Sequence, residues 1–260
     1  MSKQHCTILL WLLALVATAS TTMAAEAEYI WAENDFPGST LYMSVYQDGA
    51  WGEKEVIFSD ENINILPALG SDSAGSHLAV WVTLEPHGKS VLKCSWQQDD
   101  GWTAPQILWD GFKENLAPVV VFDASDSPWV FWSANDGDDD DILAITFKNG
   151  SWGRPFAINE ENNVPDILPQ ARLSASGDIT VSWQQLDAER GYHQATAVIG
   201  VHGRWVKSMR HANKRTEKML VTEKPQEIPL PPFEGNSRST LHFPGVHSLQ
   251  SSVIRKRVDR

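Results

Sequence analysis

An acidic run near the middle of the chain has the residue types that come closest to a metal site. It reads Asn135-Asp136-Gly137-Asp138-Asp139-Asp140-Asp141. Alternate carboxylates on a tight loop, here Asp136, Asp138 and Asp140, suit a hard cation such as Ca²⁺, which takes several oxygen ligands. The spacing and the terminal Glu of an EF-hand are absent. A solvated acidic loop is the simpler interpretation, and calcium binding is the alternative.

Three tryptophans, Trp96, Trp109 and Trp129, stand outside the regular spacing described below. An indole offers a large apolar surface with one polar edge, which suits contact with a ligand such as a sugar. We therefore predict these three as candidate ligand-binding residues. The competing interpretation is that they belong to the core.

Motifs for catalysis are missing from the sequence. It has no Ser-His-Asp arrangement, phosphate-binding loop or cysteine nucleophile motif. The histidines of the body lack metal-ligand spacing; they are His77, His87, His193 and His202. A glycosidase with two carboxylates stays open in principle, but no pair of acids is singled out. We expect a protein without catalytic residues.

The elements that position these side chains come from an internal repeat of about 51 residues. A first series of tryptophans, spaced 50, 51 and 51 residues apart, is Trp31, Trp81, Trp132 and Trp183. A second series, spaced 51, 50 and 53 residues apart, is Trp51, Trp102, Trp152 and Trp205. An Asn or Asp three residues before a proline also recurs, as in Asn64–Pro67, Asn115–Pro118 and Asp166–Pro169. Residues that recur once per repeat usually pack between neighbouring repeats, so both series predict structural tryptophans.

Each repeat carries the signals of four short antiparallel strands. Period-two alternation with Val, Trp and Phe occurs in HLAVWVT (77–83) and PWVFWSA (128–134). Tight turns separate the third and fourth strands, at Asp48-Gly49, Asp100-Gly101, Asn149-Gly150 and His202-Gly203. This pattern predicts an all-β fold, a β-propeller-like repeat with about four four-stranded blades over residues 26–208.

The first unit lacks its first strand. That strand could come from the C-terminal region, where Lys218–Glu223 is the nearest candidate. Alternatively, several chains could complete a ring as a homo-oligomer, because open strand edges invite pairing.

The turn between the third and fourth strands of the first unit reads Ser44-Val-Tyr46-Gln-Asp48-Gly49-Ala-Trp51. It resembles the Asp box, Ser-x-Asp-x-Gly-x-x-Trp, of sialidase-type β-propellers, with Tyr46 at the Asp position and the Gly shifted. The resemblance covers residues 29–208 and implies a propeller, with a degenerate or partial glycoside hydrolase as an alternative function. The family's site also needs three arginines that clamp a carboxylate. The arginines of the body are Arg154, Arg172, Arg190 and Arg204.

The charge is unevenly distributed along the chain. Residues 26–206 carry 28 acidic and 9 basic residues, and residues 207–260 carry 5 acidic and 11 basic residues. The body is therefore too acidic to favour nucleic acid or an anionic membrane. Alternating strands would bring 17 of the 28 acids to one end of the molecule. The basic tail is one partner that such an end could attract.

The two ends of the chain differ from the repeat. Residues 1–25 have the pattern of a secretory signal, with an apolar run of ten from Ile8 to Ala17 that is too short for a membrane span. No later segment is apolar enough to cross a membrane, so we expect a periplasmic or secreted protein. Cys94 is then the single cysteine of the mature chain. Residues 209–260 are basic and contain prolines, which predicts a disordered tail.

These observations together favour a binding or assembly module that performs no catalysis, with carbohydrate or protein as its partner. A degenerate glycoside hydrolase and a calcium-binding structural protein are the alternatives. No cofactor is indicated other than Ca²⁺.

Overall fold

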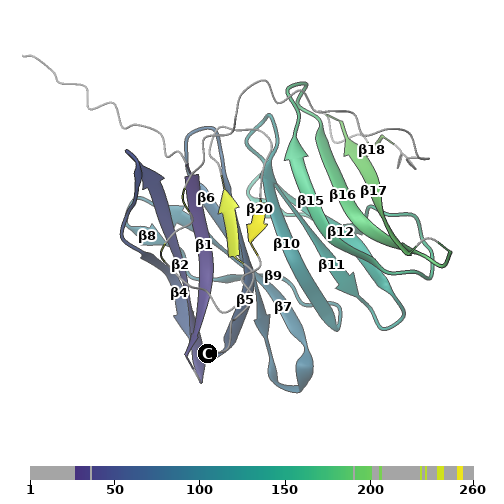
Figure 1. The fold of residues 1–260 in the computed structure, drawn as a ribbon, viewed down its shortest axis with the longest axis horizontal. Helices are drawn as coiled ribbons and strands as arrows, with labels where there is room; N and C mark the ends of the chain where they lie inside the picture. The colour runs from purple at the N-terminus through teal and green to yellow at the C-terminus, as the bar shows by residue number, and fades with distance from the viewer. Residues whose placement is uncertain are drawn as a thin grey trace, which may run out of the picture.

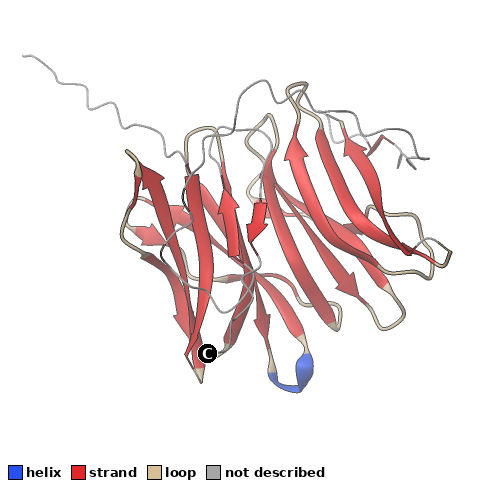
Figure 2. Cartoon of the chain, viewed as in Figure 1, coloured by secondary structure: helices blue, strands red, loops and turns tan. Residues whose placement is uncertain are grey.

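Most of the described chain is β-strand. The computed structural model describes residues 27–35, 37–189 and 191–200, and also 205–206, 229, 232, 239–242 and 251–253. Within these residues the one helical element is a single 3-10 turn, η1 (Pro86–Gly88), which joins two strands (Figure 2). The predicted all-β fold is confirmed. The predicted signal, residues 1–25, lies outside the described residues.

Four antiparallel sheets, called blades 1 to 4 below, stand side by side in chain order (Figure 1). Blade 1 contains β1 (Ala27–Asp35), β2 (Gly38–Gln47), β3 (Ala50–Trp51) and β4 (Glu55–Asp60). Blade 2 contains β5 (Ile63–Ser71), β6 (His77–Leu84), β7 (Ser90–Gln98), β8 (Gly101–Trp102) and β9 (Gln106–Trp109). Blade 3 contains β10 (Glu114–Phe122), β11 (Pro128–Asn135), β12 (Asp140–Lys148), β13 (Ser151–Trp152) and β14 (Phe156–Ala157). Blade 4 contains β15 (Asp166–Leu173), β16 (Ile179–Asp187), β17 (Gly191–Ile199) and β18 (Trp205–Val206). The predicted repeat of four four-stranded blades is confirmed.

The hairpin turns follow the sequence signals closely. Asp48-Gly49 and Asn149-Gly150 have positive φ at both residues, 53° and 80° in the first and 53° and 78° in the second. Such φ values are those of a two-residue hairpin turn. In blade 2 the turn lies one residue earlier than predicted, because Gln98 pairs with Gly101. The fourth strand of blades 1 to 3 is broken into two short pieces that pair with the same third strand.

Blade 1 receives its missing strand from the C-terminal region. Strand β19 (Ser239–His242) pairs antiparallel with β1, and β20 (Ser251–Val253) pairs with β19. The location predicted for this strand, residues 218–223, was wrong, and those residues lie outside the described part. Composition could not find β19, because a strand of four residues is selected by the free edge of β1 rather than by its own pattern. Both strands fall within the tail that was predicted to be disordered.

A β-bulge marks the first strand of blades 2, 3 and 4 at the repeated proline. The pairing register shifts at this point in each blade. The residue before each proline has a positive φ: 52° at Leu66, 50° at Ala117 and 56° at Leu168. Non-glycine residues adopt this conformation at a cost of about 1–2 kcal/mol. The bulge therefore repeats because the architecture requires it, and it fixes the direction of the Asn or Asp two residues earlier.

We expect the bulge to tolerate glycine and to reject a β-branched residue. Leu168 is 44% exposed, so its replacement removes little packing. Leu168→Gly should raise the free energy of unfolding by up to about 1 kcal/mol, whereas Leu168→Val should lower it by about 1 kcal/mol or more. Urea unfolding of both variants measures the two changes. Equal effects of the two substitutions would contradict a strained backbone at this position.

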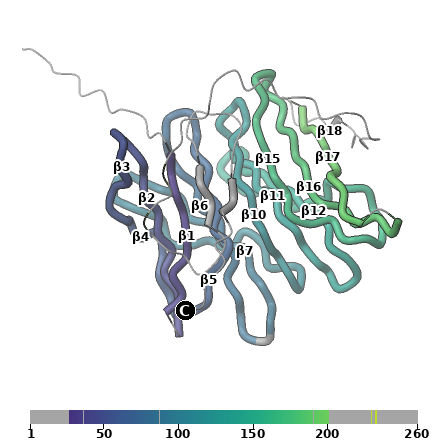
Figure 3. Tube along the Cα trace, viewed as in Figure 1, coloured from purple at the N-terminus to yellow at the C-terminus, as the bar shows by residue number. Residues whose placement is uncertain are grey.

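The core consists of layers between neighbouring blades. Separate clusters of buried side chains fill the spaces between blades 1 and 2, blades 2 and 3, and blades 3 and 4. Figure 3 shows the corresponding path of the chain, which passes from blade 1 at one side to blade 4 at the other. Blades 2 and 3 thus contribute one face to each of two layers, and blades 1 and 4 contribute to one layer each, as expected for stacked repeats.

Candidate functional site

The first-series tryptophans are structural. Trp81, Trp132 and Trp183 are at most 2% exposed. Each indole nitrogen donates a hydrogen bond to the side chain 17 residues earlier on the first strand of the same blade: Asn64 at 3.1 Å, Asn115 at 3.0 Å and Asp166 at 2.6 Å. The prediction that these residues pack between repeats is confirmed. The repeated Asn or Asp before the proline satisfies the buried indole.

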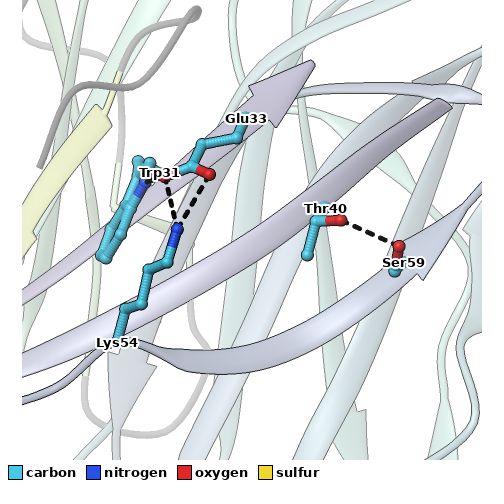
Figure 4. A network of polar contacts seen from close by, with 5 residues as sticks. All are labelled: Trp31, Glu33, Thr40, Lys54 and Ser59. Atoms are coloured by element: carbon cyan, nitrogen blue, oxygen red, sulfur yellow. Dashed lines mark hydrogen bonds and ion pairs between the residues drawn. The ribbon is translucent and has the colours of Figure 1, made fainter. Parts of the chain in front are cut away.

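In blade 1 the indole N–H of the first-series tryptophan has a different acceptor, because this blade has no equivalent Asn or Asp. Trp31 Nε1 donates to Glu33 Oε1 at 3.0 Å (Figure 4). Lys54 Nζ lies 3.0 Å from both carboxylate oxygens of Glu33 and holds that carboxylate in place. The pair is partly exposed, so it contributes about 0–1 kcal/mol to stability.

Blade 4 also departs from the repeat, because it has a carboxylate, Asp166, where blades 2 and 3 have an amide. Asp166 has no exposed surface. The pKa of Asp166 is raised, chiefly because burial disfavours its charged form. The hydrogen bonds from Asn162, Trp183 and Gln185 lower this pKa in part. The nearby charge of Asp141 adds to the upward shift. A buried acid at a position that elsewhere needs only an amide is the clearest local departure from the structural repeat.

A polar cluster surrounds Asp166 at the junction of blades 3 and 4. Asn159 Nδ2 donates to Asp141 Oδ1 at 2.6 Å and to Asp166 Oδ2 at 3.0 Å. Asn162 Nδ2 donates to Asp166 Oδ2 at 2.9 Å. Burial raises the pKa of Asp139, and the charges of Asp141, Asp136, Asp166 and Asp138 add to this shift. The group formed by Asp139, Asp141, Asn159, Asn162 and Asp166 is called the junction cluster below.

The junction cluster lies at the end of the molecule where neighbouring blades touch through their loops. Ser90 N donates to Lys113 O at 3.1 Å, and Lys113 N donates to Asn135 O at 3.2 Å. Lys89 Nζ lies 3.9 Å from Asp110. The β1–β2, β6–β7 and β11–β12 connections all emerge here, at the bottom of Figure 1, and this end is called the loop end. The opposite end carries the short hairpin turns.

The predicted calcium ligands lie beside the junction cluster. Asp136 and Asp138 belong to an exposed loop, in which Asp138 N donates to Asp136 Oδ1 at 3.1 Å. Asp140 begins β12 opposite Asn135. Burial raises the pKa of Asp140, although a hydrogen bond from Asn135 opposes the shift. Within the described residues no three His, Cys, Asp or Glu side chains are grouped to hold a metal ion. Calcium binding stays a prediction.

The three candidate tryptophans are not brought together. Trp96 packs against Phe122, Phe147 and Trp152, with ring centroids 5.5–6.4 Å apart. Trp109 ends β9 at the loop end, beside Phe112. Trp129 is 4% exposed and donates to Asp123 Oδ2 at 3.1 Å, near the opposite end. Their role in ligand binding stays a prediction, and Trp129 offers almost no surface for it.

Cys94 is a packing residue. It is buried in the layer between blades 2 and 3. Burial raises the pKa of its thiol to about 12. Because the thiolate is the reactive form, Cys94 supplies no nucleophile.

The sequence contained only part of the signal for the junction cluster. Asp166 was visible as the one acid at a position that is otherwise Asn. Asn159 and Asn162 follow the fourth strand of blade 3 in a stretch without periodicity, so nothing local marked them. Asn159 lies near Asp141 because β14 pairs with β12 within blade 3, and both asparagines contact Asp166 where the chain passes from blade 3 to blade 4.

The four stacked sheets define a β-propeller-like repeat protein. The sequence matches no known protein family and is not significantly similar to any curated protein. Among solved structures, the endo-arabinase from Bacteroides thetaiotaomicron has a TM-score of 0.50 and 13% identity, and the match covers 90% of each chain.

Two further structures are similar over a smaller part. The intramolecular trans-sialidase from Ruminococcus gnavus gives a TM-score of 0.49 at 8% identity, over 69% of this chain and 65% of that one. A Dyadobacter fermentans protein of unknown function gives 0.48 at 16% identity, over 67% of this chain and 60% of that one. This chain therefore spans less than two thirds of either protein. At such identities the similarity to the arabinase shows a shared fold and nothing finer.

Proposed function

We propose that this protein is an exported carbohydrate-binding module that performs no catalysis and takes a neutral sugar at its loop end. The junction cluster is the observation that carries the proposal. Planar carboxylate and amide groups suit sugar hydroxyls, since they accept and donate hydrogen bonds with fixed geometry. The fold shared with the endo-arabinase supports a carbohydrate ligand.

Charge favours a neutral ligand over an anionic one. The junction cluster itself contains Asp139 and Asp141, and Asp136 and Asp138 lie on the adjoining loop. An acidic surface of this kind repels an anionic ligand. Recognition of a sialic acid carboxylate would require arginines, which bind carboxylates in bidentate fashion. The described arginines are Arg154, between β13 and β14, and Arg172, in β15, and neither belongs to the junction cluster.

Burial argues against hydrolysis at the same cluster. A glycosidase needs two carboxyl groups that reach the scissile bond. Asp166 has no exposed surface and is held by Asn159, Asn162 and Trp183. Its carboxylate therefore positions the partly exposed amides of Asn159 and Asn162 instead of touching a substrate. A turnover assay tests the alternative of a degenerate or partial sialidase-type glycoside hydrolase.

The test is calorimetric titration of the mature protein with neutral arabino- and xylo-oligosaccharides, with sialyllactose as the anionic comparison. We expect binding of a neutral oligosaccharide and a loss of affinity of up to about tenfold in Asn159→Ala, which corresponds to one hydrogen bond between neutral groups. Asp72→Asn is the control, because Asp72 caps a turn between β5 and β6 at the opposite end. Equal affinities of Asn159→Ala and wild type would overturn the site.

Two other outcomes would replace the proposal. Release of reducing sugar from any of these oligosaccharides, lost in Asp141→Asn, would assign a glycoside hydrolase. A rise in melting temperature with millimolar Ca²⁺, lost in Asp138→Asn, would favour the calcium-binding structural protein. Export is supported by the sequence of residues 1–25, and within the described residues the structure contains no helix long and apolar enough to cross a membrane.

A further inference from the structure

An aromatic surface on blade 1 is not covered by any of the blades in the described part of the chain. Each first-series tryptophan of blades 2 to 4 faces the preceding blade: Trp81 packs with Ile30, Trp132 with residues of blade 2, and Trp183 with residues of blade 3. Trp31 points in the same direction from blade 1, which no blade precedes among the described residues. The side chains on this side of the sheet, called the aromatic face below, are Tyr29, Trp31, Tyr42, Tyr46 and Trp51.

The aromatic face is nevertheless buried. Trp31 is 0% exposed, Tyr29 1% and Tyr46 6%. The cluster that contains them includes no described residue of blades 2, 3 or 4. Neighbouring rings also contact one another, with centroids 5.3 Å apart for Tyr29 and Trp31 and 5.5 Å for Trp31 and Tyr42. These contacts within one sheet cannot remove both sides of the rings from water, so another part of the chain must cover the face.

The C-terminal end of the chain is the part that reaches this place. Strand β19 lies against β1, with Tyr29 opposite Leu241 and Ile30 opposite Thr240. Trp51 Nε1 donates a hydrogen bond to the carbonyl oxygen of Pro229 at 2.8 Å. Two points separated along the tail therefore contact the strands that carry the aromatic face.

The bond between Trp51 and Pro229 has a counterpart between blades. In blade 2 the second-series residue Trp102 donates its indole N–H to Glu55 Oε1 of blade 1 at 2.9 Å. In blade 1 the same repeat position, Trp51, uses a carbonyl of the tail. The tail thus takes the place that a preceding blade occupies elsewhere in the repeat.

Blade 4 provides the contrast at the other end of the row. The side of β16 and β17 that faces away from blade 3 carries Thr180, Ser182, Gln184, Gln194 and Thr196, together with Leu186, Tyr192 and Val198. Five of these eight side chains are polar, as on the outer face of a terminal repeat. A second copy that stacked its blade 4 on the aromatic face would bury these polar groups without partners, which is unfavourable. The composition of the two ends therefore disfavours ring closure by another copy.

We propose that the aromatic face of blade 1 is a docking surface for the chain's own C-terminal end, which binds there in place of a missing blade. Val206 and Pro229 are separated by 22 residues, which can span at most about 75 Å. The docked end makes the four-blade row self-sufficient as a monomer. It also assigns the basic tail to blade 1 instead of to the acidic loop end.

The test compares the full mature chain with the double variant Thr240→Pro/Leu241→Pro. Proline removes the backbone N–H groups that pair β19 with its neighbours. We expect the wild type to be a monomer by light scattering, with slow amide hydrogen exchange at residues 28–31. In the double variant these amides should exchange at least about a hundredfold faster, with new binding of a hydrophobic dye.

Two controls keep the result interpretable. Thr216→Pro/Glu217→Pro introduces the same residues into the tail outside both strands and should leave exchange in β1 unchanged. Amides of β11 in blade 3 report whether the double variant still folds. Unchanged protection at residues 28–31 in a folded Thr240→Pro/Leu241→Pro variant would overturn the proposal, as would a wild-type dimer that exchanges its subunits' C-terminal ends.

Discussion

Replacement of Trp132 by alanine is expected to lower the free energy of unfolding by about 5 kcal/mol. The side chain is fully buried between blades 2 and 3, and loss of a buried Trp costs about 3–5 kcal/mol. The change also leaves the buried Asn115 Oδ1 without its indole donor, which costs about 1–3 kcal/mol more. Since a domain of this kind is stable by about 5–15 kcal/mol, the variant should be near its unfolding threshold.

The measurement is the urea unfolding midpoint, followed by circular dichroism. Trp132→Phe should cost less, because the phenyl ring fills most of the space and only the N–H is lost. Ile107→Ala is the surface comparison, since Ile107 is 60% exposed, and it should change stability by less than about 0.5 kcal/mol. A loss below about 1 kcal/mol in Trp132→Ala would argue that the layer is loosely packed.

The second large effect is expected at a buried ion pair between blades 1 and 2. His77 Nε2 lies 2.5 Å from Glu28 Oε1, and His77 Nδ1 contacts Gln97 Oε1. Glu28 is 2% exposed and His77 8%. Burial by itself would lower the pKa of His77, but the hydrogen bond and charge of Glu28, with contributions from Gln97 and Glu55, raise it above 6.5.

The sign of the pH dependence follows from this raised pKa. A histidine whose pKa is higher in the folded state than in the unfolded state stabilises the fold fully below its unfolded pKa, about 6.5. This contribution is lost as the pH rises through the folded-state pKa. We therefore expect the stability of the wild type, relative to that of His77→Gln, to fall as the pH rises above about 6.5.

Removal of the carboxylate tests the same pair from its other side. Glu28→Ala leaves an imidazolium buried without its counter-charge, which should cost about 3–5 kcal/mol near pH 6. The cost should shrink at higher pH, where His77 can be neutral. Lys54→Ala breaks the exposed pair with Glu33 and should cost about 0–1 kcal/mol. Urea unfolding between pH 5.5 and 8.5 measures the stabilities of His77→Gln, Glu28→Ala and Lys54→Ala. A cost of Glu28→Ala that does not change with pH would show that the pair is not ionic.

The sequence by itself determined the repeat and its elements. Two tryptophan series, alternating strands and Asp-Gly or Asn-Gly turns are all short-range signals, and a strand or hairpin depends chiefly on residues within about ten positions of one another. For the same reason the sequence predicted that the first-series tryptophans are structural, since a residue repeated once per unit must meet the same surroundings each time.

Only the tertiary structure decided which residues meet across the blades. Strand β19 joins β1 from more than 200 residues away, His77 meets Glu28 across 49 residues, and Asn159 bridges Asp141 and Asp166 at the junction of two blades. None of these contacts has a local pattern. They depend on the order and direction in which whole sheets stack, and that stacking is set by the summed burial of the layers between them.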